Sequence, residues 1–490
     1  MDADGRLMLP HPALNVFAVR ENLEEHLKKT APVWSQYAKH RGDLLESRTH
    51  AALARVLPGA RFRDGLEYYL PASDDEAEAA DPSKYTKRAE GDHLIVLDDV
   101  AIIVEDKAVA LSALSRGGQD GTDPYRPDRH HHQSSRTGRA HARRHQAGRR
   151  PTQQKNEGWI DLSQIREIHT IAVSLDDIST VLTATAELVR AGLLAADNIP
   201  WTVSLHDLEL ITELVPRPAE FLLYLRRRRD PDVTVMFRAP DEMDLFLYFF
   251  EAGLWVEPDP VQVRAAFPFL PEPATAELRR YRTRKPAFLT SRTDALDQWF
   301  HTRGRDGAHS VRAPRPAMVP SPLAPLVDEL QSRNVTGWLS IGATLLSGAT
   351  DVQREFARHG DELLDNPSPK GRSLTVPLTA SVDPAEGWLF VWATRPAGAD
   401  PDETDRRLRD YLRAKKHQLG LPRGVVFLYD QPTRKLLDIC YDGHTGPLDA
   451  ALTASLSSLR PPSQLHRSIH PNAKRPQSGT RNAARHKRKR

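Results

Sequence analysis

The feature that most constrains this chain is the stretch 93–107, HLIVLDDVAIIVEDK, in which two apolar runs flank Asp98-Asp99. Apolar runs of this length, rich in Val and Ile and joined by a short polar turn, predict a β-hairpin. Asp-Asp is not among the dipeptides that two-residue hairpin turns favour. The fold must therefore include a sheet built around this hairpin, with a turn of unusual composition.

Two acids are predicted to meet across this hairpin. Counting outward from a two-residue turn places Asp92 directly opposite Glu105. Opposed residues hold their Cβ atoms about 4.5–5.5 Å apart, where like charges are destabilising. A divalent cation between the carboxylates turns this penalty into attraction, and Mg²⁺ favours one or two carboxylates together with water and phosphate. Strand alternation puts Lys107 on the face of Glu105 and turns Asp106 away from it.

Two carboxylates, a metal and a lysine suit phosphodiester hydrolysis. The reaction must neutralise charge on the phosphoryl group and generate hydroxide near neutral pH. A carboxylate-held metal does both, because it acts as a Lewis acid and lowers the pKa of bound water. The ammonium group of Lys107 can orient the attacking water or stabilise the developing negative charge.

The string Glu90-Gly91-Asp92, an apolar strand, a tight turn and then Val104-Glu105-Asp106-Lys107-Ala108 resembles the PD-(D/E)XK nuclease superfamily. The resemblance covers about residues 40–180. It implies an α/β fold with a restriction-endonuclease-like mixed sheet flanked by helices. It also implies that Asp92 and Glu105 hold Mg²⁺ or Mn²⁺ and that Lys107 is the catalytic lysine.

The same resemblance implies a further acid, because many members offer a glutamate from an earlier helix. Glu46 fits this role, since it lies on the helical row of His50, Leu53 and Leu57. An acid on such a row is costly unless it is paired or bound to a metal.

The expected partner is nucleic acid, with DNA ahead of RNA, and no membrane. Two alternatives stay open. The first is a nuclease-like fold that no longer cleaves and serves as a nucleic-acid or protein-binding module. The second is an interaction protein whose hairpin acids only form ion pairs with Arg61, Arg63 or Lys87.

With 490 residues, two or three domains are expected. The predicted division is an N-terminal helical segment (1–40), a nuclease-like domain (41–265), an Arg/Pro-rich connection (266–325), a C-terminal α/β domain (326–460) and a basic disordered tail (461–490). Periodicity and turn residues predict strands at 61–70, 168–175, 232–237, 373–380, 387–394 and 424–429. They predict helices at 20–57, 176–193, 206–227 and 241–254, and a helix ending at Gly420.

Residues 117–156 are nearly devoid of apolar side chains and rich in Arg, His and Gln. This composition favours a disordered basic loop, and its five histidines form an alternative metal cluster. When Asp123 to Arg143 is back-translated with permitted codons and read one base later, one codon choice yields TRIDLTGIITKAAEQAGRMR, an amphipathic helical pattern with a Gln. We therefore hypothesise a compensated frameshift that removes a helix beside the site, which the nucleotide sequence tests directly.

Charge and cysteine content exclude several classes of protein. The net charge of +3 does not by itself indicate nucleic acid, although the chain ends in a run of Arg, His and Lys. The single cysteine, Cys440, excludes intrachain disulfides and cysteine-based zinc sites.

No apolar run approaches the roughly 20 residues that span a bilayer, so a cytoplasmic protein is expected. The run Arg226 to Arg229 either contacts phosphate or complements a helix C-terminus.

Overall fold

The fold is described from a computed structural model and divides into two compact units. Unit 1 comprises Met1–Glu257 with Arg284–Arg358, and unit 2 comprises Pro258–Thr283 with His359–Arg490. The structure describes residues 2–3, 6–7, 14–70, 72–73, 75–76, 85–108, 152–154, 159–160, 162–177, 182–195, 199–303, 311–378 and 382–462. Most of the segment 117–156, and the basic tail from residue 463 on, lie outside these residues.

Unit 1 is built on a mixed seven-stranded sheet of order β7-β6-β3-β4-β5-β8-β9. Its strands are β3 (Arg61–Leu70), β4 (Lys87–Leu97), β5 (Val100–Lys107), β6 (Thr152–Gln154), β7 (Trp159–Ile160), β8 (Glu167–Ser174) and β9 (Trp201–Ser204). The strands from β7 to β5 pair antiparallel, whereas β5, β8 and β9 run parallel. The expected strands at 61–70 and 168–175 are thus confirmed. The short strand β6 lies in a segment expected to be a disordered loop, and its residues Gln153 and Gln154 pair with β3.

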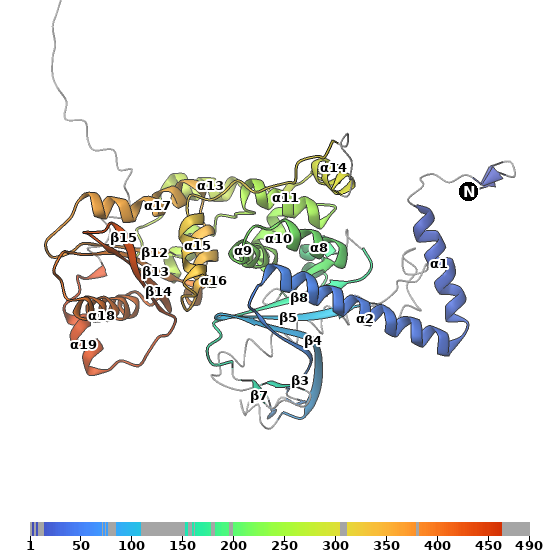
Figure 1. Ribbon diagram of the computed structural model, residues 1–490, viewed down its shortest axis with the longest axis horizontal. Coiled ribbons are helices and arrows are strands. Elements are labelled where there is room, and N and C mark those ends of the chain that lie inside the picture. The colour runs from blue at the N-terminus through green and yellow to red at the C-terminus, as the bar shows by residue number, and fades with distance from the viewer. Residues whose placement is uncertain are drawn as a thin grey trace, which may run out of the picture. The chain divides into compact units, whose positions relative to one another are not determined.

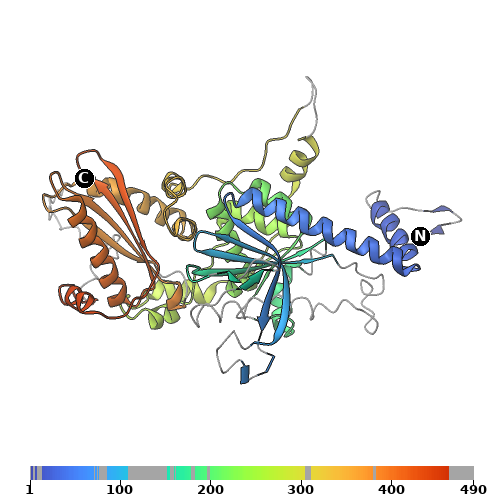
Figure 2. The ribbon, with the colours of Figure 1, turned by 60° about the horizontal axis from the view of Figure 1, so that its bottom comes forward.

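Helices flank this sheet (Figure 1, Figure 2). Among the described residues, the helices of unit 1 are α1 (Leu14–Lys28), α2 (Ala31–Val56), α7 (Thr185–Arg190), α8 (Leu205–Leu214), α9 (Pro218–Arg229), α10 (Pro231–Met236), α11 (Glu242–Ala252), α14 (Asp294–Thr302), α15 (Ala324–Ser332) and α16 (Trp338–Leu346). The helix α2 packs along β5 and against α8, which contacts β8 and β9. The expected α/β class, with a mixed sheet flanked by helices, is confirmed.

The hairpin turn is stabilised from outside the hairpin. Asp98 has a φ of 54°, a left-handed conformation that aspartate tolerates better than most residues. Its carboxylate accepts hydrogen bonds from the backbone N–H groups of Gly337 (2.8 Å) and Leu339 (3.0 Å), at the start of α16. The Ser340 hydroxyl donates to Asp99 at 2.9 Å. The Asp-Asp turn is therefore explained by capping of a distant helix, because unpaired N–H groups at a helix start favour carboxylates.

The apolar stripe of α2 differs from the expected one. The buried positions of this helix are Arg41, Leu45, Thr49, Ala52, Leu53 and Val56. Glu46 is exposed at the edge of this stripe and does not lie on it. The helix is rotated from the expected row because packing on the sheet selects the face that includes Leu45 and Thr49.

Three other expected elements differ from the structure. Within the predicted helix 176–193, the described residues 182–183 and α7 are helical and Ala184 interrupts them, and the predicted helix 206–227 is divided into α8 and α9 between Leu214 and Pro218. Proline removes a backbone donor and clashes with the preceding turn, which explains the division. The predicted strand 232–237 is mostly the helix α10, where the Asp230 side chain caps the first turn at Asp232. Capping and tertiary packing there override the β-propensity of its valines.

The boundary between the units also differs from the predicted one. The region 284–358 belongs to unit 1 because α16 packs on α9. Gly342 permits this close approach, since a Cβ atom there would lie 3.1 Å from the Cβ of Ala219. The predicted connection 266–325 therefore contains part of unit 2 and part of unit 1, including α14.

The run Arg226–Arg229 has partners inside unit 1. Its contacts include Arg226 with Glu167 and Thr344, Arg227 with the Ser347 carbonyl, Arg228 with Glu242, and Arg229 with the Ile199 carbonyl and His169. Arg228 is buried, and so is its partner Glu242. The structure therefore assigns these side chains to internal packing rather than to either predicted role.

Unit 2 holds a four-stranded sheet of order β12-β13-β14-β15. Its elements are α12 (Pro260–Ala266), α13 (Thr275–Thr283), β12 (Ser373–Leu378), β13 (Trp388–Arg395), α18 (Pro401–Leu419), β14 (Arg423–Asp430), β15 (Lys435–Asp442) and α19 (Ala450–Ser457). The helix α18 packs on β13 and β14 and ends at Gly420, whose φ is 68° as a helix C-cap requires. The three strands and the helix predicted here are confirmed, and β15 was not predicted.

The remaining described elements are two small strand pairs, one helix and a short 3₁₀ helix at Pro384–Glu386. The pairs are β1 (Asp2–Ala3) with β2 (Arg6–Leu7), and β10 (Phe237–Arg238) with β11 (Ala287–Phe288). The helix α17 (Thr350–Asp365) includes the boundary of the two units. Within the described part of the chain, no helix is long and apolar enough to cross a membrane.

Candidate active site

The hairpin has the register that the sequence predicts. Leu97 pairs with Val100, and the ladder continues to His93 opposite Val104. Asp92 and Glu105 are the next residues outward, where the β4–β5 ladder ends. The Asp92 carboxylate accepts a hydrogen bond of 2.5 Å from the backbone N–H of Asp106, so it reaches across to β5.

Lys107 lies on the face of Glu105, as strand alternation predicts. Its Nζ donates to Glu105 Oε2 at 3.0 Å. The same face continues inward into an apolar cluster that includes Leu94 and Ile103, which form a cross-strand pair. The three predicted residues Asp92, Glu105 and Lys107 are thus brought together at the polar end of a buried face.

The Glu105 carboxylate is only partly satisfied. The residue is 3% exposed, and its Oε1 has no hydrogen-bond partner. Burial raises the pKa of the Glu105 carboxyl, Lys107 opposes this rise, and the negative charge of Asp92 adds to it. A buried carboxylate oxygen without a partner is costly, and a cation at this position would relieve that cost.

Asp92 shows the same electrostatic signature. Burial raises the pKa of its carboxyl, while the backbone N–H of Asp106 and the charge of Lys107 lower it. Clusters in which desolvation and like charges both act on acids are typical of functional sites. The acid pair and its lysine therefore meet the electrostatic conditions for a metal centre.

Glu46 lies close enough to these groups to feel their charge. Although its side chain is exposed, partial desolvation raises the pKa of the Glu46 carboxyl, and Asp92 and Asp106 raise it further. The helix α2 therefore brings a third acid toward the end of β4 and β5. This placement is compatible with an assisting role but leaves Glu46 outside the buried centre.

Among the described residues, no ion pair joins Asp92 or Glu105 to Arg61, Arg63 or Lys87, the partners of the alternative interpretation. Glu105 pairs with Lys107 of its own strand. The guanidinium of Arg63 instead donates to the carbonyl of Phe62. The orphaned Glu105 oxygen and the charge repulsion with Asp92 both fit a divalent cation held by these two carboxylates.

Asp106 faces the opposite side of the sheet, as predicted, and joins a network that the sequence did not reveal. Its carboxylate accepts a hydrogen bond from Thr49 Oγ1 (2.9 Å) and lies 2.8 Å from His93 Nε2. His93 Nδ1 lies 2.6 Å from Asp64 on β3. Burial by itself would lower the pKa of His93, but Asp106 and Asp64 together raise it to about 9. Alternation alone places His93 and Asp106 on one face, and this was the available signal.

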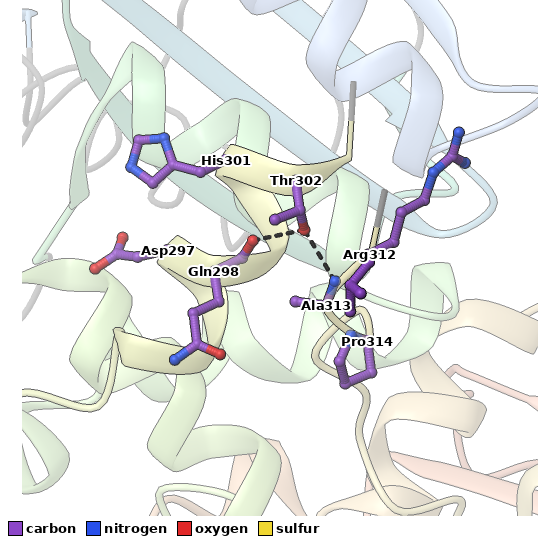
Figure 3. Close-up of a pocket in the computed structure, with 8 residues that line it drawn as sticks. Asp297, Gln298, His301, Thr302, Arg312, Ala313 and Pro314 are labelled. Atoms are coloured by element: carbon purple, nitrogen blue, oxygen red, sulfur yellow. Dashed lines mark hydrogen bonds between the residues drawn. The ribbon is translucent and has the colours of Figure 1, made fainter. Parts of the chain in front are cut away.

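A separate hollow of about 570 Å³ lies beside α14 (Figure 3). Thr302 Oγ1 donates to the Gln298 carbonyl (2.7 Å) and accepts from the Ala313 N–H (2.9 Å). These two hydrogen bonds hold Ala313 beside α14 at the wall of the hollow. Neither Asp92 nor Glu105 lines it. We therefore assign it no part in the candidate site.

Comparison with known proteins adds no assignment. No protein-family model matches the chain, and no curated protein or solved structure is significantly similar to it.

Proposed function

We propose that this chain is a metal-dependent nuclease with a PD-(D/E)XK-like site on a restriction-endonuclease-like fold. The observation that carries the proposal is the buried Glu105 carboxylate, with one oxygen free of partners, beside Asp92 and Lys107. Mg²⁺ or Mn²⁺ is the cation that such oxygen ligands favour. The proposed substrate is nucleic acid, with DNA ahead of RNA.

Each residue has a distinct role in this proposal. Asp92 and Glu105 would hold the metal, and Glu46 would assist from α2. When bound, the metal supplies Lewis acidity and a hydroxide source near neutral pH. Lys107, whose Nζ donates to Glu105 at 3.0 Å, would orient a water molecule and stabilise negative charge on the phosphoryl oxygens.

The test is a cleavage assay on the purified full chain. Single- and double-stranded DNA and RNA are incubated with Mg²⁺, Mn²⁺ or EDTA. We expect metal-dependent cleavage that falls by at least about 10²-fold in Lys107→Ala, because a positioned proton-transfer or orienting group contributes about that much. Asp92→Asn and Glu105→Gln are expected to abolish it.

Lys87→Ala is the matched control, since Lys87 is an exposed lysine of the neighbouring strand β4. Its activity should equal that of the wild type. Absence of cleavage in every metal, with nucleic-acid binding retained, would overturn the nuclease proposal in favour of a binding module. Cleavage that survives Lys107→Ala and Glu105→Gln would place the activity elsewhere.

A further inference from the structure

A second group of metal-binding side chains lies on the other face of the hairpin. It consists of His50 on α2, Asp64 on β3 and His93 on β4. One potential ligand atom from each lies within 4.8 Å of the others. His93 Nδ1 is 2.6 Å from Asp64 Oδ1, and His50 Nδ1 is 3.2 Å from Asp64 Oδ2. Ligands of a tetrahedral zinc ion are roughly 3.3 Å apart, so small side-chain adjustments suffice.

The surroundings of His93 match those of a metal-bound histidine. Its other ring nitrogen, Nε2, lies 2.8 Å from Asp106 Oδ2, and Thr49 donates to the remaining oxygen of that carboxylate. Histidines that ligate metals usually donate their second N–H to a carboxylate or carbonyl, which fixes the tautomer and ring orientation. The Asp106 side chain is only 3% exposed, and the surrounding packing restricts its orientation.

The solvent exposure of these three residues and their ligand types favour a zinc ion. The side chains of Asp64 and His50 are 55% and 39% exposed, so solvent reaches the group. Two imidazoles with one carboxylate suit Zn²⁺, whereas Mg²⁺ prefers oxygen ligands alone. Three protein ligands leave a fourth tetrahedral position for water.

We propose that His50, Asp64 and His93 form a zinc site that is separate from the acid pair of β4 and β5. It connects one helix to two strands, so the ion would clamp α2 onto the sheet. Glu46 lies one helical turn before His50 on α2. The zinc ion would therefore also position Glu46 for its role in the nuclease site, and this consequence rests on the proposed function. The zinc site itself does not depend on the proposed function.

The test measures Zn²⁺ affinity of the full chain by competition with a chelating indicator. The five histidines at 130, 131, 132, 141 and 145 are replaced by serine in every protein compared, because they offer competing ligands. We expect one tight Zn²⁺ equivalent that resists excess Mg²⁺. We also expect the visible spectrum of tetrahedral cobalt when Co²⁺ replaces zinc.

His50→Ala and Asp64→Asn should each weaken this binding by at least about 100-fold, since second-shell losses alone cost 10–100-fold. Both residues are partly exposed, so their variants should fold, which circular dichroism checks. His40→Ala is the matched control, because His40 is an exposed histidine of the same helix, and it should bind zinc like the parent.

Glu105→Gln separates this proposal from the nuclease proposal. It should remove cleavage and leave zinc affinity unchanged. A parent protein that binds no zinc would mean that only a proton joins His93 to its carboxylates, and the proposal would be wrong. Equal affinity in His50→Ala and His40→Ala would also overturn it.

Discussion

Removal of the Asp98 carboxylate should loosen α16 from the hairpin turn. This carboxylate accepts two backbone N–H groups, from Gly337 and Leu339, at 2.8 and 3.0 Å. Each hydrogen bond contributes about 1 kcal/mol net. Burial raises the pKa of the Asp98 carboxyl despite these hydrogen bonds, so its negative charge adds no further stability. Asp98→Ala therefore loses about 2 kcal/mol from these contacts, and alanine at this positive φ costs about 1 kcal/mol more.

The backbone conformation at Asp98 allows the contributions to be separated. Its φ of 54° suits glycine and is tolerated by asparagine, but it opposes alanine. Asp98→Gly should regain about 1 kcal/mol relative to Asp98→Ala, because glycine adopts this φ without steric cost. Asp98→Asn keeps one acceptor oxygen and should lose only about 1 kcal/mol. Asp98→Ala should destabilise most, Asp98→Gly less and Asp98→Asn least.

Amide hydrogen exchange of the segment 337–346 is the assay, because it reports opening of this region alone. A loss of about 3 kcal/mol corresponds to exchange roughly 100-fold faster in Asp98→Ala. The control is Asp400→Ala, which removes an aspartate cap from α18 in unit 2 and should leave the segment 337–346 unchanged. Wild-type protection in Asp98→Gly, or equal effects of asparagine and alanine, would refute the reasoning.

Two further predictions concern pH and packing. Burial, with the charge of Arg229 in support, lowers the pKa of His169 to about 4, against about 6.5 when unfolded. The unfolded state therefore binds more protons between these values, and the wild type should lose on the order of 3 kcal/mol as pH falls from about 6.5 to 4. In His169→Gln, the free energy of unfolding measured with urea should not show this part of the decline. Parallel pH profiles of the unfolding free energy in the wild type and the variant would contradict the prediction. In unit 2, Gly424→Ala should cost about 1–3 kcal/mol in urea unfolding, because its Cβ would lie 2.8 Å from Leu412 Cδ1. An unchanged urea midpoint in Gly424→Ala would contradict this prediction and show that α18 can move away from β14.

Local chemistry determined the hairpin and its acid pair. Two apolar runs and a two-residue turn specify strand pairing, and side-chain alternation in a strand has a fixed period of two. The placement of Asp92, Glu105 and Lys107 on one face therefore followed from counting, and the structure has that register. Helix α18 and its glycine cap were predictable for the same reason, because both signals lie within the segment.

Tertiary packing decided what counting could not reach. The rotation of α2 depends on which side chains fit the sheet, so the meeting of His50 with Asp64 and His93 was not visible in the sequence. The docking of α16 on α9 likewise requires the close approach permitted at Gly342, which moved the boundary between the units. Contacts between residues far apart in the chain depend on side-chain shape across elements, and no single segment carries that information.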